Sequence, residues 1–298
     1  MSEALLRELR RALPALEARQ EEPLKNHTSF AIGGPAELLL LPASAAELAS
    51  LCALLRTLGE KPLLLGNGTN VLAPDEGIRG VVIVTRRVSE MKRQGERIVA
   101  DCGASLTKIA AFAAEEGLTG LEFAYGIPGT LGGALIMNAG AYGGEMKDVT
   151  AEVEYLDGEL RRFSAAGEAL DFSYRHSRFG PEDVVLRAEL RLQPGEKEAI
   201  QARCRELMEK RRASQPLDKP SAGSAFKRPA GGYAAAMIDQ AGLKGYTVGG
   251  AQVSEKHAGF VVNLGLATAS EVKKLLEDVQ KAVYDRTGVL LEPEIKIL

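Results

Sequence analysis

Tryptophan is absent from this 298-residue chain, and cysteine, histidine and asparagine are scarce. The three cysteines, Cys52, Cys102 and Cys204, are odd in number and show no CxxC spacing, which favours neither a disulfide framework nor a zinc site. The three histidines lie far apart, with no second ligand at metal-binding spacing. We therefore expect no metal.

The chain also lacks an excess of charge of either sign. The 37 Lys and Arg against 40 Asp and Glu give a net charge of −3 and a pI of about 5.8, without the basic field of a nucleic-acid or anionic-lipid binder. No apolar run approaches the roughly 20 residues of a spanning helix, and the N-terminus lacks a signal-peptide core. We expect a cytoplasmic protein of about two domains that binds neither nucleic acid nor membranes.

Asparagine occurs only five times, at Asn26, Asn67, Asn70, Asn138 and Asn263. A heat-adapted protein avoids thermolabile amides, and a GC-rich genome has the same effect on composition. Under either bias, we expect the remaining asparagines to have specific roles.

Apolar spacing and turn residues predict a mixed α+β chain. Leucines at helical spacing predict an N-terminal helix up to Leu16, with a bend at Pro14. Residues 37–65 read as strand, helix, strand, because Ser44 and Glu47 form a capping box and Gly59 follows as a helix stop. The other predicted strands are 81–85, 97–101, 183–192, 259–263 and 289–298, with a hairpin at 151–164 turning at Asp157-Gly158 in type I′ geometry, and the other helices are 106–116, 196–212, 233–240 and 270–285.

Composition changes near residues 193–196, where a strand-rich half gives way to a smaller α/β half. We therefore predict one domain over residues 1–194, with lobes of about 1–66 and 67–194, and a second domain over 195–298.

The first glycine cluster is the motif formed by Gly66, Asn67, Gly68, Thr69 and Asn70, directly after an apolar strand. Glycine lets a ligand approach the backbone N–H groups closely, and Asn and Thr add side-chain donors, so an anion cradle is one interpretation. A plain tight turn is the other. The motif is neither a Rossmann fingerprint nor a P-loop.

The second glycine cluster spans residues 126–145 and holds seven glycines. Ordering so many glycines is entropically costly, and a long loop inside a compact domain is usually functional. A flexible surface connection is the alternative, but the Ile, Leu and Met residues within the cluster favour burial. A buried, glycine-rich backbone suits a large flat ligand.

Seven motifs, in order, resemble one known family. They are NHTSFAIGGPA, LGNGTN, GIPGTLGGALIMNAGAYGGE, YRHSRF, PSAGSAFKRP, AGLKGYTVGGAQVSEKHAGFVVN and GVLLEPEIKIL. Together they resemble the UDP-N-acetylenolpyruvoylglucosamine reductase (MurB) family from about residue 26 to the C-terminus. The resemblance implies an FAD-binding fold of the vanillyl-alcohol-oxidase (PCMH) type with two lobes, plus a separate substrate domain. The absence of a long insertion after residues 183–192 resembles the shorter type of the family, which lacks a substrate-covering tyrosine loop.

The resemblance also implies cofactor-binding residues in three segments. Residues 66–70 would hold the FAD pyrophosphate, and the second glycine cluster would lie along the cofactor. The implied cofactor-binding residues are Asn26, Thr28 and Ser29, near the flavin or adenine; Gly66, Asn67, Gly68, Thr69 and Asn70; and Gly126, Ile127, Pro128, Gly129, Thr130, Gly133, Ala134, Asn138, Ala139 and Gly140.

The family reaction reduces an enol ether conjugated to a carboxylate, with NADPH reducing FAD and the flavin passing hydride to the far vinyl carbon. The resemblance implies that Arg175 brings a fixed cation to the carboxylate or flavin, that Ser224 donates the proton, and that Glu294 is the third catalytic residue. Glu292 satisfies a period-2 strand as well as Glu294 does, and the family motif favours Glu294. In that strand, Ile295 and Ile297 would share one face.

Tyr174, Arg211 and Lys227 are the implied substrate-binding residues, for UDP-N-acetylglucosamine enolpyruvate. Lys210 and Arg212 would join them at the diphosphate, although a solvated basic helix face explains them equally well. Arg228 stands where the family often has Asn, which leaves the role of that position open. We expect a monomer.

Two other function classes fit parts of the sequence. A different flavoenzyme of the same fold, such as an oxidase of small alcohols, often carries a covalent flavin on His or Cys, and neither glycine cluster contains such a residue. A non-enzymatic nucleotide-binding module would not need Arg175, Ser224 and Glu294.

Overall fold

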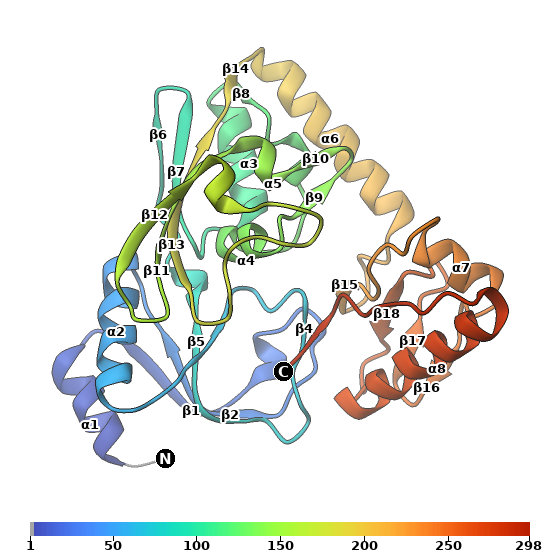
Figure 1. Cartoon of the computed structure of the whole chain (residues 1–298), viewed down its shortest axis with the longest axis horizontal. Helices are drawn as coiled ribbons and strands as arrows, with labels where there is room; N and C mark the ends of the chain where they lie inside the picture. The colour runs from blue at the N-terminus through green and yellow to red at the C-terminus, as the bar shows by residue number, and fades with distance from the viewer. Residues whose placement is uncertain (1–2) are drawn as a thin grey trace. The chain divides into compact units, whose positions relative to one another are not determined.

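The computed structural model describes residues 3–298 and divides them into two compact units (Figure 1). Unit 1 holds the residues up to Gln20 with Leu38–Asn67 and Gly80–Lys210, and unit 2 holds Glu21–Glu37, Gly68–Arg79 and Arg211–Leu298. The chain therefore passes from one unit to the other after residues 20, 37, 67, 79 and 210.

These units differ from the ranges that the sequence predicted. Residues 21–37 and 68–79 pack with the C-terminal residues, and most of the helix at 197–214 belongs to unit 1. The local sequence does not predict that these segments join the C-terminal residues, because Phe30 and Leu72 are apolar residues that would fit any core. The assignment of cofactor and substrate roles to residues 1–194 and 195–298 stays a prediction.

The predicted strand–helix–strand segment is confirmed. Strand β2 (Pro35–Leu41), helix α2 (Ala45–Thr57) and strand β3 (Leu63–Leu65) follow one another. Ser44 Oγ accepts a hydrogen bond from Glu47 N at 3.1 Å, and Gly59 follows the helix at φ +76°. The sheet order is β1 (Glu17–Pro23), β2, β5 (Ile78–Val84), β3, with β3 parallel to β5.

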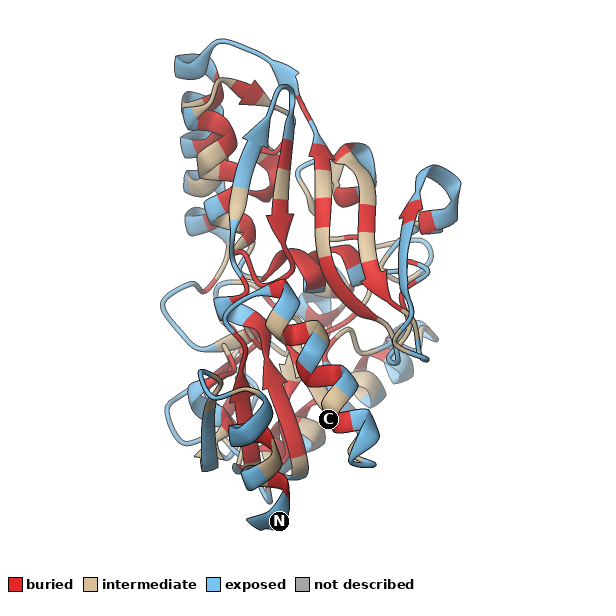
Figure 2. Cartoon of the chain, turned by 90° about the vertical axis from the view of Figure 1, so that its left-hand side faces the viewer, coloured by how far each residue is buried: buried red, intermediate tan, exposed pale blue. Residues whose placement is uncertain are grey.

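Helix α1 (Glu3–Ala12) buries Leu5 and Leu9. The predicted extension to Leu16 is wrong, because the helix ends two residues before Pro14, whose ring disfavours a helical conformation in the preceding residue. Figure 2 shows that helices of the chain carry buried residues on one face and exposed residues on the other.

A larger antiparallel sheet forms the rest of the unit 1 core. Its order is β12 (Arg162–Ala166), β11 (Thr150–Leu156), β13 (Val184–Arg191), β7 (Arg97–Asp101), β6 (Met91–Gln94). Leu186 and Leu190 of β13 are fully buried. The accompanying helices are α3 (Leu106–Glu115), α4 (Leu131–Ile136), α5 (Met146–Val149) and α6 (Lys197–Ser214).

The hairpin β11–β12 forms as predicted, but its turn does not. A five-residue loop replaces the type I′ turn, with Asp157 N donating to Arg161 O at 3.0 Å and the left-handed conformation falling on Leu160 (φ +60°) instead of Asp157 and Gly158. The Asp157 carboxylate accepts hydrogen bonds from Glu159 N and Arg161 N. These two bonds stabilise the longer loop, which the Asp-Gly pair alone does not reveal.

The second glycine cluster is not one continuous loop. It contains α4 and a short ribbon of β9 (Gly140–Ala141) and β10 (Gly144–Glu145). Two glycines among six residues lower helix propensity, so the sequence did not predict α4. The predicted burial holds for Leu131 and Leu135, whereas Ile136 is exposed.

Unit 2 packs a small antiparallel sheet against two helices. The sheet order is β15 (Ser221–Ser224), β18 (Phe260–Asn263), β17 (Ala251–Val253), β16 (Thr247–Val248), and the helices are α7 (Ala234–Gln240) and α8 (Ala269–Thr287). Thr268 and Glu271 form a reciprocal capping box at the start of α8, and Gly288 ends it at φ +70°. The core combines α8 residues with Phe30, Ile32 and Leu72.

The prediction of one strand over residues 289–298 is wrong. Only β19 (Lys296–Ile297) forms, parallel to β4 (Val71–Leu72). Pro293 has no N–H, and the segment changes partner, because Glu294 N donates to Ala225 O and Lys296 N donates to Asn70 O. Ile295 is therefore buried while Ile297 is 48% exposed, so these residues do not share a face.

The remaining elements are short. They are the strands β8 (Leu118–Thr119) and β14 (Gln193–Pro194), which pair with each other, and the 3-10 helices Leu24–Asn26, Thr85–Arg87, Glu122–Ala124 and Gly167–Leu170.

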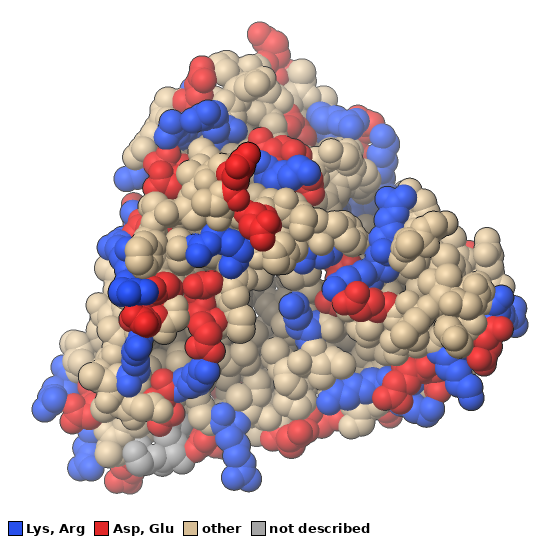
Figure 3. Space-filling view, in the orientation of Figure 1, with Lys and Arg blue, Asp and Glu red and all other residues tan. Residues whose placement is uncertain are grey.

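The surface mixes both signs of charge. Figure 3 shows Lys and Arg interspersed with Asp and Glu over the face that it draws. Within residues 3–298, no helix is both long and apolar enough to cross a membrane, and no group of three metal-ligating side chains is found.

Candidate active site

Ser29 joins three segments of unit 2 that lie far apart in the sequence. Ser29 N donates to Gly68 O at 3.1 Å, and Ser29 Oγ donates to Ser221 O at 2.7 Å. Ser221 N donates back to Ser29 O at 3.2 Å. The structure thus places the first predicted cofactor segment and the end of the GNGTN motif beside the strand that carries Ser224.

Ser224 and Glu294 lie on neighbouring segments of unit 2. Ser224 is half-buried at the end of β15, where it pairs with Phe260, and Gly223 precedes it at φ +78° within an irregular part of the strand. Glu294 N donates to the carbonyl of Ala225, the residue after Ser224, at 2.8 Å. The segments that carry two of the three predicted catalytic residues are therefore bonded to each other at one edge of the small sheet.

Asn70 connects the glycine motif to this edge. Its Nδ2 donates to Glu294 O at 3.2 Å, and its carbonyl accepts from Lys296 N at 2.9 Å. A predicted cofactor residue and a predicted catalytic residue, 224 positions apart, are thus in direct contact.

Lys227 lies close to the same edge of the small sheet, three residues after Ser224. Its backbone N donates to Glu292 O at 2.8 Å, and its ammonium forms an ion pair with the Glu292 carboxylate. The choice of Glu294 over Glu292 as the functional carboxyl stays a prediction from the family motif.

The basic residues at the end of α6 differ from one another. Arg211 is buried, and its Nη1 donates to Gln215 Oε1 at 3.1 Å. Lys210 forms an ion pair with Glu206 at 2.6 Å, one helical turn earlier, with both side chains about half exposed. This fits the solvated-face interpretation for Lys210.

Gly68 is required by packing within unit 2. It adopts φ +58°, and an added Cβ would overlap the His27 carbonyl oxygen and lie 2.9 Å from Thr28 Cα. This close backbone contact supports the tight-turn interpretation, but it leaves donors for an anion. Among residues 3–298, no acceptor is found for the amides of Gly68 and Thr69. Neutral N–H and hydroxyl donors are what a pyrophosphate needs, so this segment fits FAD.

Unit 1 holds the other predicted cofactor residues. Gly129 O accepts from Leu106 N at 3.0 Å, Leu131 N donates to Ala104 O at 2.9 Å, and Gly132 N donates to Cys102 O at 2.8 Å. A Cβ on Gly66 would overlap the hydroxyl of Thr130, which is buried. Backbone bonds therefore hold the start of the second glycine cluster in one conformation.

Asn138 is buried and adopts φ +40°. Its Nδ2 donates to Glu145 Oε2 at 2.9 Å and to Ser173 O at 3.1 Å, and its Oδ1 accepts from Lys147 N at 2.9 Å. Protein atoms thus bind the side-chain amide of Asn138. The predicted contact of Asn138 with the cofactor stays a prediction. The scarcity of asparagine was the signal that this residue has a specific role.

Tyr174 and Arg175 form a tight turn in unit 1. Ser173 N donates to His176 O and His176 N donates to Ser173 O, both at 3.1 Å, and Arg175 adopts φ +56°. The Arg175 guanidinium lies 5.3 Å from the centre of the Tyr174 ring. Arg175 thus belongs to unit 1, whereas Ser224 and Glu294 belong to unit 2.

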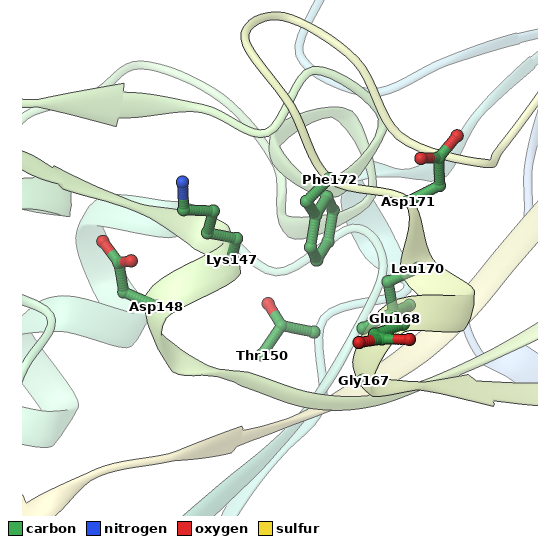
Figure 4. Close-up of a pocket in the computed structure, with 8 residues that line it drawn as sticks. All are labelled: Lys147, Asp148, Thr150, Gly167, Glu168, Leu170, Asp171 and Phe172. Carbon is green, nitrogen blue, oxygen red and sulfur yellow. The ribbon is translucent and has the colours of Figure 1, made fainter.

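A pocket of about 550 Å³ lies beside this turn (Figure 4). It is lined by Lys147, Asp148, Thr150, Gly167, Glu168, Leu170, Asp171 and Phe172. None of the predicted site residues lines it, and Asp171 is engaged by His176 at 3.0 Å.

His27 is a buried polar residue that the sequence did not single out as a cofactor residue. Its Nε2 lies 2.8 Å from Glu22 Oε1, and its Nδ1 has no partner among residues 3–298. Its place between Asn26 and Thr28 in the first motif was the available signal.

The cysteines do not contribute a reactive thiolate. Burial raises the pKa of Cys52 to about 11, and burial together with the charge of Asp101 raises the pKa of Cys102 to about 12. All three thiols are free and buried. They therefore act as small apolar residues of the core.

Two family models match the chain, and together they show its class. A model described as FAD binding domain matches residues 36–164, and one described as UDP-N-acetylenolpyruvoylglucosamine reductase, C-terminal domain, matches residues 215–298. The chain is thus an FAD-containing oxidoreductase with a two-domain α+β FAD-binding fold, as the sequence predicted.

Whole-chain comparisons give the family. The UDP-N-acetylenolpyruvoylglucosamine reductase of Caldanaerobacter subterraneus is 49% identical over 100% of this chain and 99% of its own length, and that of Caldicellulosiruptor saccharolyticus is 46% identical over 95% and 92%. The crystal structure of the reductase (MurB) from Thermus caldophilus shares 36% identity with a TM-score of 0.81, over 95% of this chain and 98% of that one. The chain belongs to the UDP-N-acetylenolpyruvoylglucosamine reductase family. Its cofactor is FAD, and NADPH is the reductant of the family.

A more distant likeness shows the fold alone. Alkyldihydroxyacetonephosphate synthase is 17% identical with a TM-score of 0.50, over 65% of this chain and 41% of that one.

Proposed function

We propose that the chain catalyses the NADPH-dependent reduction of UDP-N-acetylglucosamine enolpyruvate to UDP-N-acetylmuramate, as a monomer in the cytoplasm. Family membership over the whole chain supports the reaction. The contact from Asn70 Nδ2 to Glu294 O carries the assignment of the site, because it joins the glycine motif to the edge that holds Ser224.

FAD, when bound, supplies a carrier that accepts hydride from NADPH and passes it to the far vinyl carbon of the substrate. We assign its pyrophosphate to the amides of Gly68 and Thr69. In unit 1, the segment from Gly126 to Gly140 would lie along the cofactor, and backbone bonds to residues 102–106 hold residues 129–132 of that segment in place.

Ser224 donates the proton to the carbon next to the substrate carboxylate. A serine hydroxyl is a weak acid, so transfer requires a strongly basic carbon and a fixed hydroxyl. The pairing of Ser224 with Phe260 on β18, together with the bond from Glu294 N to Ala225 O, fixes the backbone on both sides of the hydroxyl.

Arg175 and Glu294 handle the negative charge that hydride addition leaves on the substrate. An Arg guanidinium can bind a carboxylate through two parallel hydrogen bonds. A carboxylate beside developing negative charge is unfavourable unless a proton or a cation compensates it, and Glu294 is the carboxyl that we assign to this step. Tyr174, Arg211 and Lys227 bind the rest of the substrate.

The proposed role of Ser224 is tested by measuring the two half-reactions separately in the Ser224→Ala variant. Bleaching of the flavin by NADPH needs no serine proton, so it should stay near the wild-type rate. Reoxidation by the enolpyruvyl substrate should slow about 10²–10⁴-fold, the usual loss for a missing general acid. Ser224→Cys should recover part of the rate, because a thiol can still donate a proton.

Ser221→Ala is the matched control, since it removes a hydroxyl from the same strand while the hydrogen bonds between Ser221 and Ser29 use the Ser221 backbone. Rapid mixing under anaerobic conditions measures both steps. Equal slowing of both half-reactions, or of neither, would show that Ser224 is a turn residue. Reoxidation by air as fast as by the substrate would favour an oxidase instead.

A further inference from the structure

The backbone at Arg175 is held in a conformation that arginine does not favour. A residue with a Cβ in the left-handed region costs about 1–2 kcal/mol, and Arg175 lies there at φ +56°. The two hydrogen bonds between Ser173 and His176 close the turn, but they do not attach it to the rest of unit 1. Other contacts must set the direction in which the turn points.

One attachment comes from the side-chain amide of Asn138. Both of its polar atoms are used: Nδ2 donates to Ser173 O at 3.1 Å and to Glu145 Oε2 at 2.9 Å, while Oδ1 accepts from Lys147 N at 2.9 Å. Asn138 is 1% exposed, so these bonds are shielded from water. The amide therefore ties the base of the turn to the start of α5.

A second attachment lies two residues after the turn. Ser177 Oγ donates to Ile136 O at 3.0 Å, and Ser177 is buried. On the outer side, His176 pairs with Asp171, but both side chains are more than half exposed, and such pairs contribute little. Figure 4 shows Asp171 and Phe172 on the loop opposite Lys147, across the pocket. Two buried restraints on the turn thus come from within the second glycine cluster.

We propose that Asn138 is a positioning residue that holds the Tyr174–Arg175 turn through the Ser173 carbonyl and so aims the Arg175 side chain. The proposal rests on the catalytic role proposed for Arg175. An asparagine suits the task because it offers two N–H donors and one acceptor without charge. An aspartate could accept from Lys147 N, but it could not donate to Ser173 O, and it would repel the Glu145 carboxylate.

The first variant is Asn138→Gly, because glycine adopts φ +40° freely and removes the whole amide. Reoxidation of the reduced holoenzyme by the substrate should slow about 10- to 100-fold, since a shift of about 1 Å in a catalytic group costs that much. Flavin bleaching by NADPH should slow much less than reoxidation does. Asn138→Asp, which keeps the acceptor alone, should not restore the rate.

A double-mutant cycle with Arg175→Ala separates positioning from general stability. If Asn138 acts through Arg175, adding Asn138→Gly to Arg175→Ala should slow reoxidation no further. Thr150→Val is the matched control: it removes a side-chain hydrogen bond to Met146 O in the same region of unit 1, and its rates should stay at wild type.

Trypsin supplies a readout that needs no turnover. Cleavage of the folded holoenzyme after Arg175 should be at least several-fold faster in Asn138→Gly than in wild type or Thr150→Val, because the released turn fits a protease site more readily.

The outcomes distinguish the two proposals. Wild-type reoxidation in Asn138→Gly, additive slowing in the Arg175→Ala background, or unchanged cleavage after Arg175 would each overturn the role of Asn138. If Arg175→Ala itself reoxidises at the wild-type rate, the catalytic role of Arg175 fails, and the cleavage rate then still decides whether Asn138 holds the turn.

Discussion

Single polar side chains connect segments that are distant in the sequence. Three of the five asparagines do this: Asn70 donates to Glu294 O, Asn138 to Ser173 O, and Asn263 to Phe30 O. Asparagine carries a donor and an acceptor on a short, neutral side chain, so one residue can bond two backbone segments without the cost of burying a charge. The expectation that the few asparagines have specific roles agrees with these three contacts.

Gly68→Ala tests the close backbone contact at the glycine motif. The variant should lose stability through its left-handed φ, about 1–2 kcal/mol, and a further 1–3 kcal/mol because the Cβ would overlap His27 O. It should also retain less FAD than wild type, measured as flavin absorbance per purified protein.

Gly95→Ala is its matched control. Gly95 has nearly the same conformation, φ +63° against +58°, and nothing lies within 4 Å of an added Cβ. Only the conformational cost should appear in urea unfolding of Gly95→Ala, and its FAD content should be normal. Equal destabilisation of the two variants would refute the packing requirement at Gly68.

At the scale of elements, caps and short strand pairs attach the inserted segments of unit 2. Helix α8 has a capping box of its own, and it also receives Asp75 from residues 68–79: the carboxylate accepts from Ala269 N at 2.7 Å and from Ser270 N at 3.0 Å. An acidic group at a helix N-terminus bonds free N–H groups and favours the helix dipole. Asp75 thus joins the middle of the chain to its last helix.

Asp75→Ala should destabilise the protein by about 1 kcal/mol at pH 7, the usual value of a lost N-terminal cap. Partial burial works to raise the pKa of the Asp75 carboxyl, but the hydrogen bonds from Ala269 and Ser270 and the charge of Lys273 lower it below its usual value. A lowered pKa means that the stabilisation is complete above the usual pKa of aspartate and is lost as the pH falls through the folded-state pKa.

The difference between wild type and Asp75→Ala in urea midpoint should therefore shrink between about pH 5 and pH 2. Asp218→Ala, which removes an exposed aspartate of unit 2, should show no such difference at either pH. A gap that persists undiminished at pH 2 would contradict the role of the ionised carboxylate.

At the scale of the whole molecule, each compact unit is assembled from three separate stretches of the chain. Unit 2 takes Phe30 and Ile32 from the N-terminal region and Leu72 from the region after the glycine motif, and all three are buried in its core. The same two inserted stretches carry the predicted cofactor residues Ser29 and Asn70. The stretches that complete the core of unit 2 are therefore also the stretches that bring the glycine motif to Ser224 and Glu294.

A fragment of residues 195–298 should not fold by itself, because it lacks these three core residues and the β4 partner of β19. Circular dichroism and the dispersion of its amide proton signals should report an unfolded or aggregated chain, while the full-length protein unfolds cooperatively. A fragment that folds as a stable monomer would instead support the predicted boundary at residue 195.

The sequence by itself determined the α+β class, the capped helix after Ser44, most strands of five or more residues and the glycine-rich segments, because each depends on residues within a few positions of one another. Its family motifs also named Ser224 and Glu294. Only the tertiary structure decided that residues 21–37 and 68–79 join unit 2 and that Asn138 bonds to Ser173 across 35 positions. These features depend on contacts between segments that are far apart in the sequence. Such contacts stabilise the protein only once the chain has packed.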